Sequence, residues 1–421
     1  MAQSSTNPIR KRRVFYIPGY DPIHPRRYRE LYRKEGTEQA AFSGYDIALS
    51  PKQGQEPYGW HVDAAMDGAQ VQSDIEVLVW SDIVRDSMGK SIPATYAQLI
   101  RTAWTYIASG ALWRLMKLRK GPVIAALYPV LFLLLQLALA LGLGHLAGRA
   151  LVRAWGLIPL GSESTAFAAR MLLEGAAYWL GLLSVAWIVL RWFKARDGKF
   201  FAYYLMHDYA YSARWHGANP PELEARMYQF RSQIATAVQE NVDEVLVVGH
   251  SSGAHLAVSI LSDLIRSGRV PAGGPALGFL SLGQVVPMVS FLPKADRLRA
   301  DLAYLSARDE LFWLDVTAPG DGCAFALCDP VAVTGVAPPD KRWPIVISAA
   351  FTQTLSPERW QQLKRRFFRL HFQYLCAFDR PADYDYFRIT AGPLTLAQRY
   401  AGRAPSKSRI ETPVSKYRSM L

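Results

Sequence analysis

The most pronounced hydrophobic pattern in the chain is a pair of long apolar stretches near its middle. Val123–Leu143 has no charged residue, and Met171–Leu190 has one, Glu174. About 20 apolar residues in a helix are enough to cross the hydrocarbon core of a bilayer, which is roughly 30 Å thick. We therefore predict two transmembrane helices. The alternative is a helical hairpin buried in a large soluble core, which would show a similar pattern.

Basic residues flank this pair unequally. They are frequent just before the first stretch, in 114–120, and just after the second, in 191–196, whereas the connecting segment has fewer of them. Segments rich in Lys and Arg tend to remain in the cytoplasm. We therefore predict that both outer flanks face the cytoplasm. The amphipathic segment 146–160 is expected to lie flat on the far membrane surface.

Short apolar and β-branched runs occur on both sides of the apolar pair, and several of them adjoin helical periodicity. The predicted strands lie within 13–21, 74–80, 245–248, 277–283, 312–319 and 343–348, and the clearest predicted helices are 221–240, 254–265 and 357–368. Alternating strands and helices are typical of a mostly parallel sheet with helices on its faces. We predict an α/β fold of this kind, interrupted by the two-helix insertion.

This interpretation divides the chain into five parts. They are a basic flexible N-terminus (1–11), the first part of the sheet domain (12–110), the inserted transmembrane hairpin (111–196), the second part of the sheet domain (197–398) and a basic flexible tail (399–421). Both parts of the sheet domain must lie on the same side of a bilayer, so the chain has to cross it an even number of times. Two spans meet this condition, and a single span would not.

Composition narrows the classes of function. The chain has 421 residues, of which 50% are hydrophobic and 20% are charged. A chain of this composition can bury a core, so a disordered protein is excluded. The net charge is +13, but no recognition motif of basic and aromatic residues accompanies it, so nucleic-acid binding does not explain the charge. The three cysteines are too few for a disulfide framework, and none lies in a CxxC pair, so we expect a reducing compartment and no structural zinc. No apolar region follows the basic residues at the N-terminus, which argues against a secretory signal. We predict no metal and no cofactor.

The clearest chemical motif is Gly249–Gly253 (GHSSG), which follows the strand pattern of 245–248 and precedes the helical pattern of 254–265. A serine on a sharp turn between a strand and a helix is exposed at the edge of a sheet. Glycine two residues to either side lets the flanking chains approach closely. A bare GxSxG also arises by chance, so the strand before it and the helix after it carry the argument. Ser251 is therefore a candidate nucleophile.

With this turn, the chain resembles the α/β-hydrolase superfamily, particularly its lipases and esterases, over roughly residues 12–100 and 200–395. The resemblance implies a catalytic triad in the chain order serine, acidic residue, histidine, with Ser251 as the nucleophile. Only His255 and His371 follow Ser251 in the chain. Since His255 lies one turn along the helix after Ser251 and cannot swing back toward it, His371 is the candidate base.

The acidic residue of this triad has several candidates. Asp321 lies in a Gly-Asp-Gly turn after the predicted strand 312–319, at the carboxyl edge of the sheet. An open α/β sheet places its site at this edge. Asp309 and Asp329 are alternatives, whereas Asp315 lies within the strand itself. We choose Asp321, although a Gly-Asp-Gly segment is also typical of a plain turn.

Acyl transfer needs two backbone N–H groups that hold the developing oxyanion. By the resemblance, one belongs to Ser252 and the other to Tyr20, which follows Pro18 and Gly19 after the first predicted strand. Pro18 stands where the family usually has histidine, which weakens the match at this loop. An ordinary Pro-Gly turn is the alternative.

Together these features predict a membrane-anchored serine hydrolase that faces the cytoplasm and cleaves carboxylic esters through Ser251, His371 and Asp321. The expected partners are the bilayer and a membrane lipid or acyl substrate, with no nucleic acid. Two alternatives stay open. One is a membrane-tethered scaffold without catalysis, and the other is an acyltransferase or thioesterase that uses the same three residues.

Overall fold

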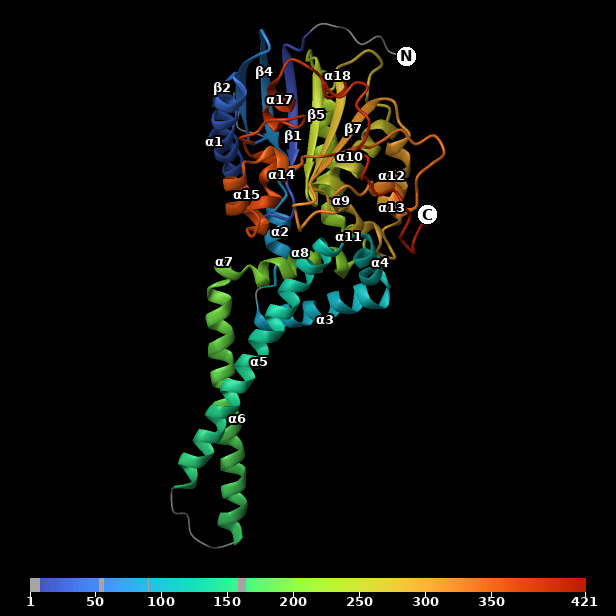
Figure 1. Ribbon diagram of the computed structural model, residues 1–421. Helices are drawn as coiled ribbons and strands as arrows, with labels where there is room; N and C mark the ends of the chain where they lie inside the picture. The colour runs from blue at the N-terminus through green and yellow to red at the C-terminus, as the bar shows by residue number, and fades with distance from the viewer. Residues whose placement is uncertain (1–7, 53–56, 90, 158–163) are drawn as a thin grey trace. The chain divides into compact units, whose positions relative to one another are not determined.

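The computed structural model describes residues 8–52, 57–89, 91–157 and 164–421. Within them, eight strands form one mixed sheet in the order β2-β3-β4-β1-β5-β6-β7-β8 (Figure 1). The strands are β1 (Lys11–Ile17), β2 (Asp46–Pro51), β3 (Gly59–Met66), β4 (Ala69–Val77), β5 (Glu244–His250), β6 (Ala276–Leu282), β7 (Leu311–Thr317) and β8 (Ile345–Ser348). The sheet is parallel from β4 through β1 and on to β8, and the β2–β3 and β3–β4 pairs are antiparallel. The predicted α/β fold with a mostly parallel sheet is confirmed.

The centre of the sheet is apolar on both faces. Every residue of β5 is buried. Successive side chains of a strand point to opposite faces, so Leu246 and Val248 enter one core while Val245 and Val247 face the other layer. A parallel strand covered on both faces reads as a continuous apolar run, which is why β5 was recognisable in the sequence.

Helices cover both faces of the sheet. On one face, α10 (Gly253–Arg266) packs on β5 between α9 (Pro221–Ala237) and α12 (Asp296–Ser306). On the other face, α1 (Arg26–Ser43), α14 (Phe351–Thr354), α15 (Pro357–Leu363), α16 (Phe367–His371) and α17 (Tyr386–Ala391) contribute to a second core. The remaining helices of this part are α2 (Ser81–Ser87), α4 (Ala111–Leu118), α11 (Val286–Ser290), α13 (Pro330–Thr334), the 3₁₀ helix η1 (Gln373–Leu375) and α18 (Leu396–Arg399).

Contacts divide the chain into two compact units. The first, Met1–Ser87, Trp104–Ile124 and Ser212–Leu421, contains the sheet. The second, Met88–Ala103 and Ala125–Tyr211, contains most of the long helix α5 (Lys120–Gly156) and all of α6 (Ser164–Ala195). It also includes α7 (Asp197–Phe200), α8 (Ala202–Arg214) up to Tyr211, and the start of α3 (Ile92–Ala108). β1 and β5 are neighbours in the sheet although both long helices lie between them in the sequence. The two sides of the insertion therefore share one sheet, as the crossing argument requires.

Two helices are long and apolar enough to cross a membrane. In the most apolar window of Lys120–Gly156 only 28% is buried, and in that of Phe167–Ala195 only 17%. A helix that is apolar all round but exposed does not resemble the core helix of a soluble protein. The low burial therefore argues against the alternative of a hairpin inside a soluble core.

The first long helix differs from its prediction in one respect. α5 runs without interruption to Gly156, so residues 146–156 continue the long helix. The prediction of a separate segment 146–160 that lies flat on the membrane is therefore wrong for these residues, and 158–160 lie outside the described residues. Ala, Leu and Arg, which favour helix, fill most of this stretch, and it has no proline.

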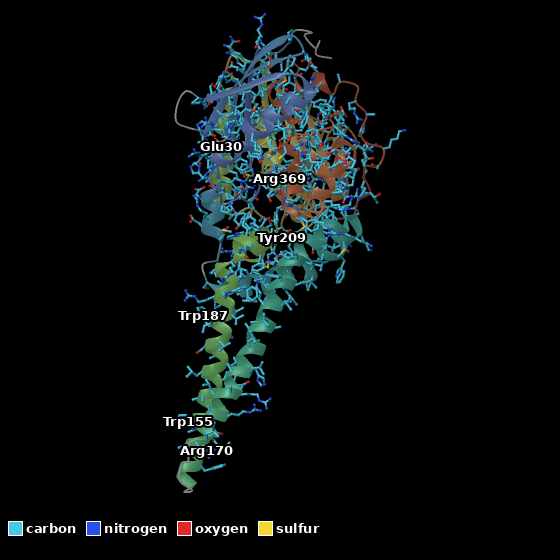
Figure 2. All side chains as sticks on the ribbon, turned by 60° about the vertical axis from the view of Figure 1, so that its left-hand side comes forward. Glu30, Trp155, Arg170, Trp187, Tyr209 and Arg369 are labelled. Atoms are coloured by element: carbon cyan, nitrogen blue, oxygen red, sulfur yellow. The ribbon has the colours of Figure 1, made fainter. Side chains whose placement is uncertain are left out.

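α5 and α6 approach each other closely through glycines. A Cβ at Gly144 would lie 2.5 Å from the carbonyl oxygen of Leu182, and one at Gly148 would lie 2.6 Å from that of Tyr178. Small residues four apart are a common basis for close packing of helices in membranes. Towards the end where the two helices are joined, Figure 2 shows Trp155 on α5 near Arg170 on α6.

Glu174, the one acidic residue of the second apolar stretch, is not isolated. The Arg170 guanidinium Nε donates to its carboxylate at 2.9 Å, one helical turn away. An ion pair of this kind lowers the cost of placing either charge near a bilayer.

The C-terminal tail, predicted to be flexible, is bonded to the sheet unit. The Ser406 N–H donates to the Val346 carbonyl oxygen at 2.8 Å, and the Val414 N–H donates to that of Val333 at 2.9 Å. The Arg114 guanidinium donates to the Val414 carbonyl oxygen at 2.8 Å. These long-range backbone partners were not visible in a polar, basic sequence. Of the basic N-terminus, residues 1–7 lie outside the described residues.

Candidate active site

Ser251 lies in a strained turn between β5 and α10. Its φ of 56° is in the left-handed region, which a residue other than glycine rarely adopts. A Cβ at Gly253 would lie 2.1 Å from the Ile17 carbonyl oxygen, and a Cβ at Gly249 would lie 2.7 Å from the Ala254 Cα. Only glycine fits at either position. The predicted sequence of strand, sharp turn and helix is confirmed, and Ser251 stands at its tip.

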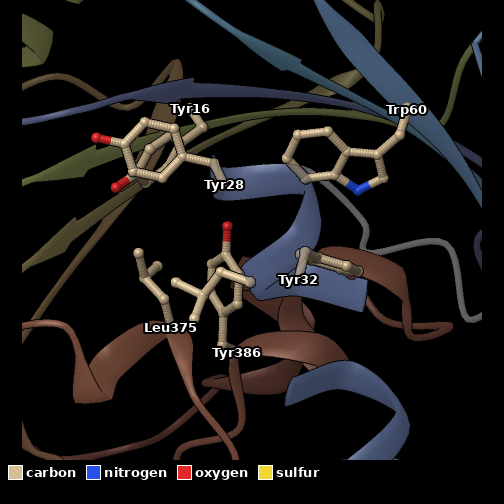
Figure 3. A pocket seen from close by; sticks show the side chains of 7 residues that line it. Tyr16, Tyr28, Tyr32, Trp60, Leu375 and Tyr386 are labelled. Carbon is tan, nitrogen blue, oxygen red and sulfur yellow. The ribbon is translucent and has the colours of Figure 1, made fainter. Parts of the chain in front are cut away.

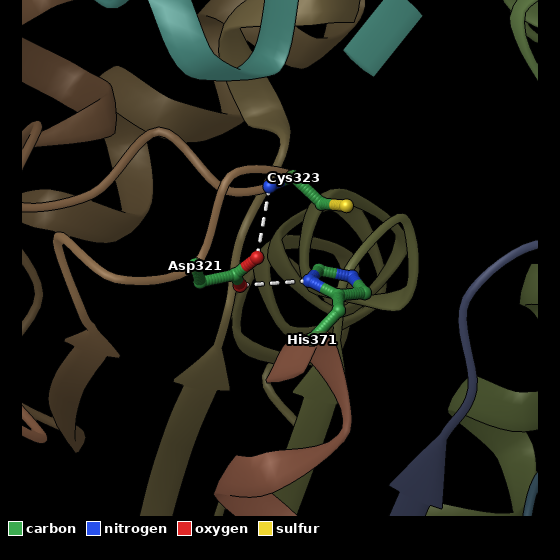
Figure 4. A group of neighbouring side chains, drawn as sticks. All are labelled: Asp321, Cys323 and His371. Atoms are coloured by element: carbon green, nitrogen blue, oxygen red, sulfur yellow. Dashed lines mark hydrogen bonds and ion pairs between the residues drawn. The ribbon is translucent and has the colours of Figure 1, made fainter. Parts of the chain in front are cut away.

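Asp321 and His371 form a hydrogen-bonded pair. The His371 Nδ1 and the Asp321 Oδ2 are 2.8 Å apart (Figure 4). The Tyr374 hydroxyl donates to the same Oδ2 at 3.0 Å, and the Cys323 N–H donates to Oδ1 at 2.8 Å. Both side chains of the pair are almost fully buried. The carboxylate is thus held by three donors, and one of them is the imidazole.

The electrostatics of this pair favour a charged carboxylate. Burial alone would raise the pKa of Asp321, but the charge and hydrogen bond of His371 lower it, as do the Cys323 N–H and the Tyr374 hydroxyl. The net direction of the pKa of Asp321 is below its ordinary value. Asp321 is therefore suited to fix the Nδ1–H tautomer of His371, which leaves Nε2 as an acceptor.

The other aspartates considered from the sequence have different surroundings. Asp309 is exposed before β7, at the amino end of that strand and hence at the opposite edge of the sheet. Asp329 caps α13 and pairs with Lys341 at 2.6 Å. Asp315 accepts from the Ser281 hydroxyl inside the sheet. Among the aspartates that the structure describes, Asp321 is the one bonded to His371.

The imidazole and the serine lie at the same edge of the sheet. The Ser251 N–H donates to the Leu282 carbonyl oxygen at 2.9 Å, and the next residue, Gly283, is so close to the imidazole that a Cβ there would lie 3.2 Å from the His371 Cε1. Within the described chain no hydrogen bond joins the Ser251 Oγ to His371. Such bonds are often long in the absence of substrate and shorten in the reactive complex.

The loop after β1 lies directly against Ser251. A Cβ at Gly19 would be 2.9 Å from the Ser251 Cβ and 3.3 Å from its Oγ. The neighbouring Tyr20 is anchored by a 2.6 Å hydrogen bond between its hydroxyl and the Ser87 Oγ. Ser252 is the residue immediately before α10. The resemblance predicts that Ser252 and Tyr20 supply N–H groups. Ser252 directly follows the serine in the chain, and Tyr20 directly follows Gly19, which lies against the serine.

Two residues near the pair were missed from the sequence. Tyr374 holds Asp321 as described above. His250 has a pKa lowered to about 3, mainly by burial and then by its neighbour His371, so it is neutral. Its Nε2 is 2.9 Å from the His371 carbonyl oxygen and its Nδ1 is 3.3 Å from the Tyr16 hydroxyl, so the neutral ring donates through Nε2 and accepts through Nδ1. In the sequence, these residues could have been noticed only by their positions: Tyr374 is three residues after His371, and His250 directly precedes Ser251.

A small hollow lies on the α1 side of the sheet (Figure 3), and one of the residues that line it, Tyr16, is hydrogen-bonded to His250. Its volume is about 10 Å³, roughly the space that one water molecule needs. Its lining is mostly aromatic and consists of Tyr16, Tyr28, Leu31, Tyr32, Trp60, Leu375 and Tyr386. It is too small for an acyl chain, so it does not serve as the substrate pocket in this state.

Asp315 gives a prediction about stability. Burial raises its pKa to about 8, and Asp329 adds to this effect. The unfolded carboxyl ionises near pH 4, so between about pH 4 and pH 8 the folded protein binds a proton that the unfolded chain lacks. Stability therefore falls as pH rises through this window, by at most about 1.4 kcal/mol per pH unit. We expect Asp315→Asn to remove this slope, so that the variant gains stability over the wild type between pH 5 and pH 8 in thermal unfolding. Parallel curves for the two proteins would show that Asp315 is ionised in the folded state.

No family model matches this chain, and no curated protein or solved structure does either.

Proposed function

We propose that this protein is a serine hydrolase of the α/β-hydrolase type, tethered to a membrane by α5 and α6. The observation that carries the proposal is the Asp321–His371 hydrogen bond at the sheet edge where Ser251 occupies a left-handed turn. The chain order of the three residues is serine, acid, histidine, and the bond between the acid and the histidine is the one that such a triad needs, which supports the proposal. The proposal adopts the triad predicted from the sequence.

In this mechanism His371 takes the proton of the Ser251 hydroxyl through Nε2, while Nδ1–H stays bonded to Asp321. The serine oxygen attacks the ester carbonyl, and the negative charge that develops is stabilised by the N–H groups of Ser252 and Tyr20. The imidazolium returns its proton to the leaving alcohol. Water, activated by the same imidazole, then releases the acid from the acyl-enzyme.

The substrates we propose are esters or thioesters of acyl chains that dissolve in the bilayer. Two exposed apolar helices would hold the site near the membrane surface and thereby raise the local concentration of such substrates. The basic flanks 114–120 and 191–196 favour a cytoplasmic position for the sheet unit. Transfer of the acyl group to an alcohol in place of water would use the same residues.

A fluorophosphonate probe tests this function. We expect the purified full-length protein in detergent to be labelled, and peptide mapping to locate the adduct on Ser251. Ser251→Ala should abolish labelling. Ser267→Ala is the matched control, since this serine is exposed at the carboxyl end of α10, and the variant should label like the wild type. Absence of labelling in the wild type, or equal labelling of Ser251→Ala, would favour the non-catalytic scaffold.

A further inference from the structure

A thiol lies beside the proposed Asp321–His371 pair. The Cys323 Sγ, a carboxylate oxygen of Asp321 and a ring nitrogen of His371 all lie within 4.8 Å of one another. Figure 4 shows the Cys323 thiol next to the His371 imidazole, with Asp321 beside both. The position of the thiol follows from the turn, because the Cys323 N–H is bonded to Asp321 only two residues earlier. Cys323 is half-buried, whereas Cys328 and Cys376 are buried.

These three groups have the chemistry of a metal site. Thiolate sulfur and imidazole nitrogen are the ligands that Zn²⁺ and similar divalent ions prefer. Because the Nδ1 of His371 is bonded to Asp321, the nitrogen left for a metal is Nε2. A carboxylate bonded to the other ring nitrogen is also the usual second partner of a metal-bound histidine, since it fixes the ring and raises its basicity. In such a site, Asp321 would be the carboxylate that orients the ring, and His371 would be the metal ligand.

We propose that Cys323 and His371 bind Zn²⁺ or a similar thiophilic divalent cation, with Asp321 as the orienting partner and water in the remaining positions. Binding converts the Cys323 thiol to a thiolate and releases its proton, so affinity rises with pH. The metal occupies Nε2, the atom that accepts the proton of Ser251 in the proposed mechanism. Occupation of the site therefore inhibits the hydrolase reversibly, and this last step rests on the proposed function.

The binding site itself is tested with Co²⁺, independently of catalysis. Titration of the metal-free, full-length protein in detergent is expected to produce the thiolate-to-cobalt charge-transfer absorption, and Zn²⁺ should displace it. Cys323→Ala should lose the absorption, although Cys328 and Cys376 remain. Ser251→Ala should keep it, because the serine is not a ligand. No charge-transfer absorption in the wild type, or the same absorption in Cys323→Ala, would overturn the site.

The inhibition is tested with the fluorophosphonate reaction. Zn²⁺ should slow labelling of the wild type, and a chelator should restore it. The labelling rate of each protein without metal serves as its own reference, and relative to that rate Cys323→Ala should need about tenfold more Zn²⁺ or higher for half inhibition. If that variant folds poorly, Cys323→Ser serves in its place. Equal sensitivity of the variant and the wild type would refute inhibition through Cys323. A metal-free wild type that does not label would refute the proposed function alone, and the cobalt titration would still decide the metal site.

Discussion

Asp321→Asn is expected to lower kcat for ester hydrolysis about 10⁴-fold, the loss typical of this change in a serine, histidine and acid triad. The asparagine can keep an oxygen toward the Cys323 N–H and present its NH₂ group to the His371 Nδ1. The imidazole then carries its proton on Nε2 and can no longer accept one from Ser251. Shape and volume hardly change, so the fold should persist. The measurement is steady-state hydrolysis of a soluble acyl ester, with thermal unfolding as a check.

Asp309→Asn is the matched control for this prediction. It makes the same chemical change at an exposed position at the amino end of β7, and kcat should stay at the wild-type value. A kcat of Asp321→Asn within tenfold of the wild type would show that the imidazole does not depend on this carboxylate. A comparable loss in Asp309→Asn would show that the effect is not local to the pair.

The parts of the fold that could be predicted are those whose cause is local. β5 and α10 were recognisable because a buried parallel strand, a sharp turn and an amphipathic helix each leave a pattern in consecutive residues. β2 and β3 were missed. In β3, Trp60 and Val62 are buried while the intervening His61 is only partly covered, as expected for an antiparallel strand near the edge of a sheet. The alternation of apolar and polar residues in the sequence of β3 is interrupted at Ala65, and alanine is a poor strand former.

The candidate site was predictable to the extent that chain order and sheet topology restrict it. Elimination left His371 as the one suitable histidine, and the carboxyl edge of the sheet favoured Asp321 over its neighbours. The role of Tyr374 could not be predicted from the sequence. Its bond to Asp321 forms only because the tertiary fold brings η1 next to the turn after β7. The thiol of Cys323 was passed over for a related reason. Its closeness to His371 comes from the tertiary fold, since the two residues are far apart in the chain and lack any metal-binding spacing.

The turn that carries Ser251 leads to the second large effect, in Gly253→Ala. A Cβ at this position would lie 2.1 Å from the Ile17 carbonyl oxygen and 2.7 Å from that of Pro18. Both atoms belong to backbone, and Ile17 ends β1, the neighbour of β5. The overlap can be relieved only by moving the turn away from β1. We expect a loss of roughly 3 kcal/mol or more in the free energy of unfolding, at the upper end of what overpacking costs, and no fluorophosphonate labelling of Ser251.

Thermal unfolding of the detergent-solubilised protein, followed by tryptophan fluorescence, measures this loss. Gly198→Ala is the control, because a Cβ there meets no atom within 4 Å and the residue is exposed on α7. It should unfold within a few degrees of the wild type, since alanine in a helix is favourable by about 1 kcal/mol over glycine. A Gly253→Ala protein with wild-type stability and labelling would mean that the turn does not press against β1. The strained position of Ser251, on which the proposed chemistry depends, would then lose its physical basis, because the close approach of the flanking chains is what holds a serine at a positive φ.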